Sequence, residues 1–147
     1  MTTTDAALYR LMTWLSPAYP VGAFSYGHGL EYAVEENLVR DRERLQHGGA
    51  TAIEAGAGKI DGALLAAAWH AAVRDNGKHL DEIAEIAAAW RGTAETALES
   101  EAQGAAFLAV TRTAWPHPLL DRLAPDRRGG PIALPVAVGA TCGGQNG

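Results

Sequence analysis

Residues 15–31 read LSPAYPVGAFSYGHGLE, and this stretch separates two predicted helices near the start of the chain. Pro17 pushes the residue before it out of the helical region, so a helix that precedes the stretch must end by Ser16. The stretch also combines prolines and glycines with aromatic side chains: Pro17, Pro20, Gly22, Gly27, Gly29, Tyr19, Phe24 and Tyr26. A segment of this composition has a defined shape, and we expect either a tightly packed turn or an interaction surface.

Helical periodicity lies on both sides of residues 15–31. From Asp5 to Leu15 an amphipathic helix is predicted, with Thr4 or Asp5 as its N-cap and with apolar residues at Leu8, Leu11, Met12 and Leu15. A second helix is predicted to begin near Ser25. Further helices are predicted from Ile60 to a stop at Asn76, from Leu80 to Trp90, from Thr96 to Ala114 and from Leu119 to Ala124.

Capping and breaking residues refine these boundaries. Thr96 and Glu99 have the spacing of a capping box. Five glycines between residues 46 and 62 predict a weak or broken helix, because each costs a helix interior about 1 kcal/mol relative to Ala. Residues 126–131 read as an exposed loop. An apolar pattern resumes over residues 132–138, but the glycine-rich end of the chain predicts that this last helix is not completed.

The composition favours helices. The 147 residues include 30 Ala and 15 Leu, against 5 Ile and 7 Val, so helix formers greatly outnumber β-branched residues. No segment has a convincing strand pattern. A chain of this length buries roughly 70% of its unfolded surface. We therefore expect an all-α fold, a single-domain helical bundle over residues 1–147.

Charge and cysteine content exclude several classes of partner. The net charge is −5 and only 2 of the 12 basic residues are Lys, so no basic stripe is present for nucleic acid or anionic lipid. Cys142 is the only cysteine, which excludes an internal disulfide and a thiolate cluster for a metal. Neither a signal peptide nor a membrane-spanning run is recognisable. We expect a soluble, cytoplasmic protein that binds neither nucleic acid nor membrane.

Three motifs could carry chemistry, and each also has a simpler structural interpretation. Ser25 lies in AFSYG, close to the G-x-S-x-G pattern of serine hydrolases, but the turn lacks a preceding buried strand; helix capping by Ser25 is favoured, and a hydrolase stays an alternative. Glycines near His28 and Lys59 fail to complete a P-loop. The five histidines show no metal-binding pairing, so no cofactor or permanent metal site is expected, although transient metal contact at His28 stays open.

Several segments, in order along the chain, resemble the UreF family of urease accessory proteins. The first block resembles the N-terminal signature of that family: Leu15-Ser16-Pro17, Pro20 to Tyr26, and Gly29-Leu30-Glu31. Later blocks also resemble it: Gly58 to Asp61, Arg91 with Glu95, Glu99-Ser100, Gln103-Gly104, Trp115 to Pro118, and Pro131 to Gly139. The resemblance covers nearly the whole chain. An unrelated helical interaction module is the remaining alternative.

The resemblance implies a function and a set of contact residues. UreF-like proteins are all-α, form homodimers and are not enzymes; they bind UreD (also called UreH), recruit and regulate the GTPase UreG, and assist nickel incorporation into apo-urease. Family members are longer, so we expect this chain to lack their C-terminal helices. Glu31 is expected to couple to the GTPase. The implied partner-binding residues are Pro20, Gly22, Phe24, Ser25, Tyr26, Gly29, Leu30, Glu31, Arg91, Glu95, Glu99 and Gln103.

Overall fold

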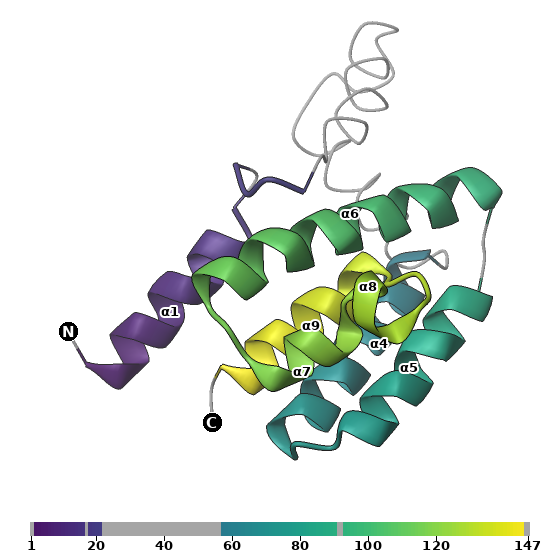
Figure 1. Ribbon diagram of the computed structural model, residues 1–147. Helices are drawn as coiled ribbons and strands as arrows, with labels where there is room; N and C mark the ends of the chain where they lie inside the picture. Colours follow the sequence, from purple (N-terminus) through teal and green to yellow (C-terminus); the bar gives the residue numbers. More distant parts are fainter. Residues whose placement is uncertain (1, 17, 22–56, 91–92, 146–147) are drawn as a thin grey trace, which may run out of the picture.

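The computed structural model describes residues 2–16, 18–21, 57–90 and 93–145 (Figure 1). These residues form helices and contain no strand, which confirms the predicted all-α class for the described part of the chain. The helix predicted near Ser25 lies outside it. The helices are α1 (Thr3–Trp14), α4 (Ala57–Val73), α5 (Gly77–Ala89), α6 (Ala94–Ala114), α7 (Pro118–Leu123), α8 (Pro125–Arg128) and α9 (Leu134–Gly144).

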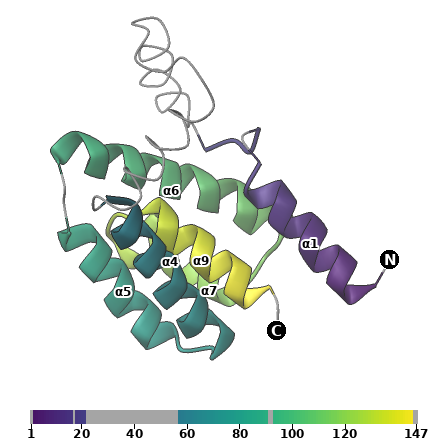
Figure 2. The same ribbon diagram turned by 180° about the vertical axis from the view of Figure 1, so that it is seen from behind.

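Helix α9 occupies the centre of the bundle. It lies between α4 and α7, and α6 packs along it (Figure 1; Figure 2). Its sequence of small and β-branched residues has no polar face, and Val136, Ala137 and Ala140 are fully buried. Pro135 lies in its first turn, where the missing N–H is tolerated. The prediction that this helix is not completed was therefore wrong.

The glycines of α9 permit its close contact with α4, so they do not break the helix as the sequence pattern predicts. A Cβ atom added at Gly139 would overlap the carbonyl oxygen of Leu65 on α4, and one added at Gly143 would lie 2.6 Å from the carbonyl oxygen of Trp69. The two helices approach so closely that side chains at these positions have no room. The local helix penalty of glycine is thus outweighed by the contact it permits.

Two helix starts differ from the sequence predictions. Helix α4 begins at Ala57 and includes Gly58 and Gly62, so the described end of the predicted weak segment is helical; residues 46–56 lie outside the described part. Helix α6 begins at Ala94, two residues before the predicted Thr96 start, because the side chain of the N-cap Thr93 accepts a hydrogen bond from the Thr96 N–H at 3.2 Å. The capping box therefore uses Thr93 with Thr96, and the predicted Thr96–Glu99 box was wrong.

The boundaries of α5 and α8 also differ from the predicted ones, and capping residues account for both differences. Asn76 was predicted as a stop, and it is the N-cap of α5, where its Oδ1 accepts a hydrogen bond from the His79 N–H at 3.0 Å. Residues 126–128 of the predicted loop belong to the one-turn α8, which begins at Pro125 and is capped by Gly129 with φ of 72°. Both corrections shift boundaries and leave the order of helices unchanged.

Helix α1 lies at the edge of the bundle (Figure 1). Its N-cap is Thr2, with Asp5 completing a capping box, so the predicted N-cap was wrong by two or three residues. Trp14 is the buried anchor: its ring packs edge-on against Trp115 with centroids 5.6 Å apart. The apolar residues that suggested an amphipathic helix are instead exposed, namely Leu8, Leu11, Met12 and Leu15.

Candidate partner-binding surface on helix α6

Five side chains form one row along α6, because residues four positions apart lie on the same face of a helix. We call this the α6 row. It runs from an exposed end to a buried end: Glu95 is exposed, Glu99 is half-buried, and Gln103 is only 2% exposed. Phe107 and Thr111 continue the row and are fully buried. Each step of four residues turns about 40° around α6, so the row winds from the solvent side of the helix into the core.

The buried end of the α6 row contacts Tyr19, which belongs to the described part of residues 15–31. The ring of Tyr19 packs against Phe107 with centroids 5.2 Å apart, and its hydroxyl group lies 2.8 Å from the Thr111 hydroxyl. Backbone hydrogen bonds from Tyr19 N to Ser16 O and from Val21 N to Tyr19 O shape the turn. The expectation of a tightly packed turn is thus confirmed for residues 18–21.

The middle of the α6 row carries buried polar atoms that have no partner among the described residues. Among the residues that the structure describes, neither the Oε1 nor the Nε2 atom of Gln103 has a hydrogen-bond partner, and the Oε1 atom of Glu99 has none either. Buried polar groups are satisfied in the great majority of cases, and leaving one unsatisfied costs about 1–3 kcal/mol. Three such atoms on neighbouring turns leave buried hydrogen-bonding capacity unused within the described part of the chain.

The neighbouring face of α6 is fixed against the start of α9, which sets the orientation of the row. The Ser100 hydroxyl accepts a hydrogen bond from the Leu134 N–H at 3.2 Å. A Cβ atom at Gly104 would overlap the carbonyl oxygen of Ile132, so the two segments are in backbone contact. Helix α6 therefore cannot rotate about its axis without losing these contacts.

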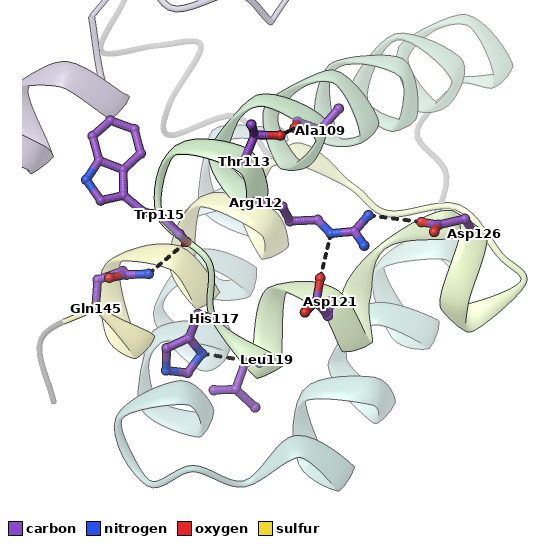
Figure 3. A network of polar contacts seen from close by, with 9 residues as sticks. All are labelled: Ala109, Arg112, Thr113, Trp115, His117, Leu119, Asp121, Asp126 and Gln145. Atoms are coloured by element: carbon purple, nitrogen blue, oxygen red, sulfur yellow. Dashed lines mark hydrogen bonds and ion pairs between the residues drawn. The ribbon is translucent and has the colours of Figure 1, made fainter.

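A polar network ties the C-terminal end of α6 to the helices that follow (Figure 3). Arg112 contacts Asp121 on α7 at 2.9 Å and Asp126 on α8 at 3.0 Å. The hydrogen bond to Asp121, with the charges of both carboxylates, raises the pKa of Arg112. The amide of Gln145 donates to the Trp115 carbonyl at 3.1 Å, beyond the end of α9. These contacts fix the C-terminal end of α6 relative to α7, α8 and the end of α9.

The structure brings together three of the sequence-predicted contact residues and places a fourth, Pro20, beside the anchor residue Tyr19. Glu95, Glu99 and Gln103 share the α6 row, and exposed Pro20 directly follows Tyr19, which anchors to that row. The other predicted residues lie outside the described part: Gly22, Phe24, Ser25, Tyr26, Gly29, Leu30, Glu31 and Arg91. The hydrolase alternative at Ser25 and the open question at His28 are therefore untested.

Sequence reasoning missed the partnership of Tyr19 with Thr111. The available signal was the spacing of Thr111 four residues after Phe107, which places a hydroxyl group on the buried side of α6. Within the described residues, no group of three or more His, Cys, Asp or Glu side chains could hold a metal ion. In the same residues, no helix is both long and apolar enough to cross a membrane.

Comparison with known proteins identifies the family. Residues 39–146, more than half of the chain, match the family model named UreF. This chain belongs to the UreF family. The matched region begins after residues 15–31 and includes the α6 row, so it confirms the predicted resemblance through the later segments of the chain.

Named relatives agree with this membership. The chain is 60% identical over 114 residues to a urease accessory protein UreF of Granulibacter bethesdensis, covering 78% of this chain and 48% of the relative. It is 49% identical over 139 residues to UreF 1 of Brucella canis, covering 95% and 58%. A UreF of Rhodopseudomonas palustris is 49% identical over 135 residues, covering 92% and 55%.

The UreF relatives set two limits on the comparison. The chain spans about half the length of the curated relatives that it matches. These relatives are named as urease accessory proteins. No solved structure matches the chain.

Proposed function

We propose that this chain acts as a urease accessory protein, a chaperone that assists nickel incorporation into apo-urease through protein contacts. The observation that carries the proposal is its UreF membership, with relatives named as urease accessory proteins at up to 60% identity. Nickel is the cargo of this process, and the proposal requires no resident metal or cofactor in the chain. We propose that the chain acts in the cytoplasm.

The α6 row is the described part of the proposed contact surface. Glu99 and Gln103 offer two acceptor oxygens and one amide donor that have no partner among the described residues. Because these atoms are buried, a bound protein would have to draw the two side chains outward to pair them, and it would then recover the unfavourable free energy of these groups. The proposed partner at this surface is UreD (UreH), since a permanent partner could keep such groups covered.

The proposal extends to residues outside the described part. Residues 22–31 and Arg91 would contribute to partner contact together with the described Pro20, and Glu31 would couple binding to GTP hydrolysis by UreG. Homodimer formation belongs to the same proposal. To test this coupling, the rate of GTP hydrolysis by UreG is measured with the unchanged chain and with the Glu31→Gln variant. We expect the two rates to differ.

Copurification tests the main proposal. The chain carries an affinity tag and is expressed with UreD and UreG of Granulibacter bethesdensis, and the full UreF of that organism serves as the positive control. We expect the chain to retain UreD, Gln103→Met to lower the retained amount by about tenfold or more, and Glu85→Gln on α5 to leave it unchanged. If the full UreF retains UreD and the chain does not, the proposal is wrong for this chain.

A further inference from the structure

A surface hollow lies where α5, α7 and α8 meet, and it has a volume of about 490 Å³. Three arginines line it, Arg122 of α7 and Arg127 and Arg128 of α8, together with Gly129 and Gly130 after them. The hollow thus gathers three guanidinium groups in a chain whose net charge is −5.

Two carboxylates of α5 also line the hollow and neutralise part of this positive charge. Arg122 donates to Asp81 at 2.6 Å, so these two groups form a closed ion pair. Glu85 lines the hollow but forms no ion pair among the described residues, and neither Arg127 nor Arg128 forms one there. Two guanidinium groups therefore stand against one carboxylate, which leaves a surplus of one positive charge in the hollow.

The acidic residues next to Arg127 and Arg128 in the sequence are already engaged elsewhere. Asp126 of α8 contacts Arg112 of α6 at 3.0 Å, and Asp121 of α7 contacts the same guanidinium group at 2.9 Å (Figure 3). These carboxylates balance Arg112. Both arginines of α8 are therefore available to a group from outside the described part of the chain.

The guanidinium group of Arg128 is already held in position. Its Nε atom is buried and has no hydrogen-bond partner among the described residues, whereas its other nitrogen atoms are not buried. The group lies over Gly130, where an added Cβ atom would be 3.7 Å from Nε and 3.9 Å from Nη2. A guanidinium group that is fixed in advance loses less conformational entropy when its exposed amino groups bind a ligand.

We propose that this hollow binds an acidic segment of another protein, with an Asp or Glu side chain of that segment paired with Arg127 and Arg128. The planar guanidinium group matches a carboxylate through two parallel hydrogen bonds. One carboxylate carries the single negative charge that balances the surplus, whereas a phosphate group carries up to two. The inference does not rest on the urease role, since it uses residues outside the α6 row.

The open shape of the hollow favours a protein segment over a small carboxylate. Arg122, Arg127 and Gly129 are exposed, and a second hollow of about 500 Å³ adjoins the first, since Arg122 and Arg127 line both. Small-molecule sites enclose most of the ligand surface, which two open hollows do not. A protein segment can lie across both. Of the two carboxylates in the second hollow, Asp121 is already paired, and Asp75 would meet a neutral or basic residue of the segment.

Peptide titrations followed by NMR test the proposal on the whole chain. Three peptides of about ten residues have blocked ends and a Gly–Ser background, and they differ at two central positions, which are Glu, Gln or phosphoserine. The ionic strength is about 0.01 M, where charges are weakly screened. Because the chain has a net charge of −5, its overall charge opposes binding of the Glu peptide, so binding requires a local site.

The variants are Arg127→Gln, Arg128→Gln and Arg128→Lys, and the matched control is Arg74→Gln. Arg74 is exposed, forms no ion pair among the described residues and lines neither hollow. Because Arg127 and Arg128 also lack ion-pair partners there, we expect their substitution to leave the fold intact, and circular dichroism checks this for each variant.

The expected results separate the hollow from general attraction between charges. The Glu peptide shifts the Nε–Hε signals of Arg127 and Arg128, whereas the Gln peptide shifts neither and the phosphoserine peptide binds no more tightly than the Glu peptide. Arg127→Gln and Arg128→Gln each weaken binding by about threefold or more. Arg128→Lys weakens it by about twofold, because the charge stays and the paired hydrogen bonds are lost. Arg74→Gln binds as the unchanged chain does.

Five outcomes would overturn the inference: no shift with the Glu peptide, equal binding of the Gln peptide, tighter binding of the phosphoserine peptide, an equal loss in Arg74→Gln, or a dimer in sedimentation velocity that Arg127→Gln abolishes. The third result would assign the hollow to phosphate groups, and the last would assign it to contact between copies. The variants leave Glu99 and Gln103 intact, so this proposal and the proposed UreD contact can fail separately.

Discussion

The hydroxyl groups of Tyr19 and Thr111 lie 2.8 Å apart in the core, although 92 positions separate them in the sequence. The Thr111 hydroxyl also lies 2.6 Å from the Phe107 carbonyl, to which it donates its only proton. Tyr19 is therefore the donor to Thr111. This contact joins the turn of residues 18–21 to the buried end of the α6 row.

Replacing Tyr19 by Phe tests the energetic weight of that contact. The substitution keeps the ring against Phe107 and removes only the hydroxyl group, so the free energy of unfolding should fall by about 1 kcal/mol. Urea denaturation measures the change. Tyr9→Phe is the control, because the Tyr9 side chain is 68% exposed. Equal stability of the two variants would show that the Tyr19 hydroxyl adds nothing to the fold.

The close contact of α9 with α4 predicts opposite effects at two glycines. Gly139→Ala forces a methyl group against the Leu65 carbonyl and should lower the free energy of unfolding by about 1–3 kcal/mol. Gly62→Ala on α4 meets no atom within 4 Å and should raise it by up to about 1 kcal/mol through helix propensity. Thermal unfolding followed by circular dichroism compares them. A Gly139→Ala variant as stable as Gly62→Ala contradicts the close approach.

The unpartnered amide of Gln103 predicts that its loss stabilises the chain alone. Gln103→Met keeps a similar volume and removes buried polar atoms, so the free energy of unfolding should rise by about 1 kcal/mol. Gln145→Met is the matched control with the opposite sign, because the Gln145 amide donates to the Trp115 carbonyl. Urea denaturation of both variants measures the difference. If Gln103→Met destabilises the chain as Gln145→Met does, the Gln103 amide has a partner.

Burial of Cys142 predicts low thiol reactivity in the folded chain. Burial raises the pKa of the Cys142 thiol, which lines a shallow groove with Leu11 and Trp14 of α1. Because the folded pKa lies above the unfolded one, this group's contribution to stability is present below the ordinary thiol pKa and is lost as the pH rises through the folded value. Iodoacetamide should therefore alkylate folded protein more slowly than protein in urea.

A pH series checks the sign of that prediction. The alkylation rate of the folded chain should reach its midpoint at a higher pH than the rate of the unfolded chain. Cys142→Ala should reduce the loss of stability at alkaline pH that is seen for the unchanged chain. A midpoint at the same pH in both states would mean that the thiol is exposed enough to titrate normally.

Local rules predicted much of the secondary structure. The extent of α6 to Ala114, the buried face of α5 at Leu80, Ile83 and Ala87, and the short helix after Trp115 all follow from periodicity and proline positions. These features depend on residues within one or two turns of each other. For the same reason, the spacing of Glu95, Glu99 and Gln103 already placed them on one helix face.

Other features required contacts between distant residues. Gly139 and Gly143 resemble helix breakers until α4 lies against them, and the apolar pattern of α1 does not reveal that Trp14 is its anchor. The sequence by itself determined the all-α class, because helix periodicity is local. Only the tertiary structure decided which glycines are contacts, which face of α1 is exposed and that Tyr19 meets Thr111, because each depends on what another helix places nearby.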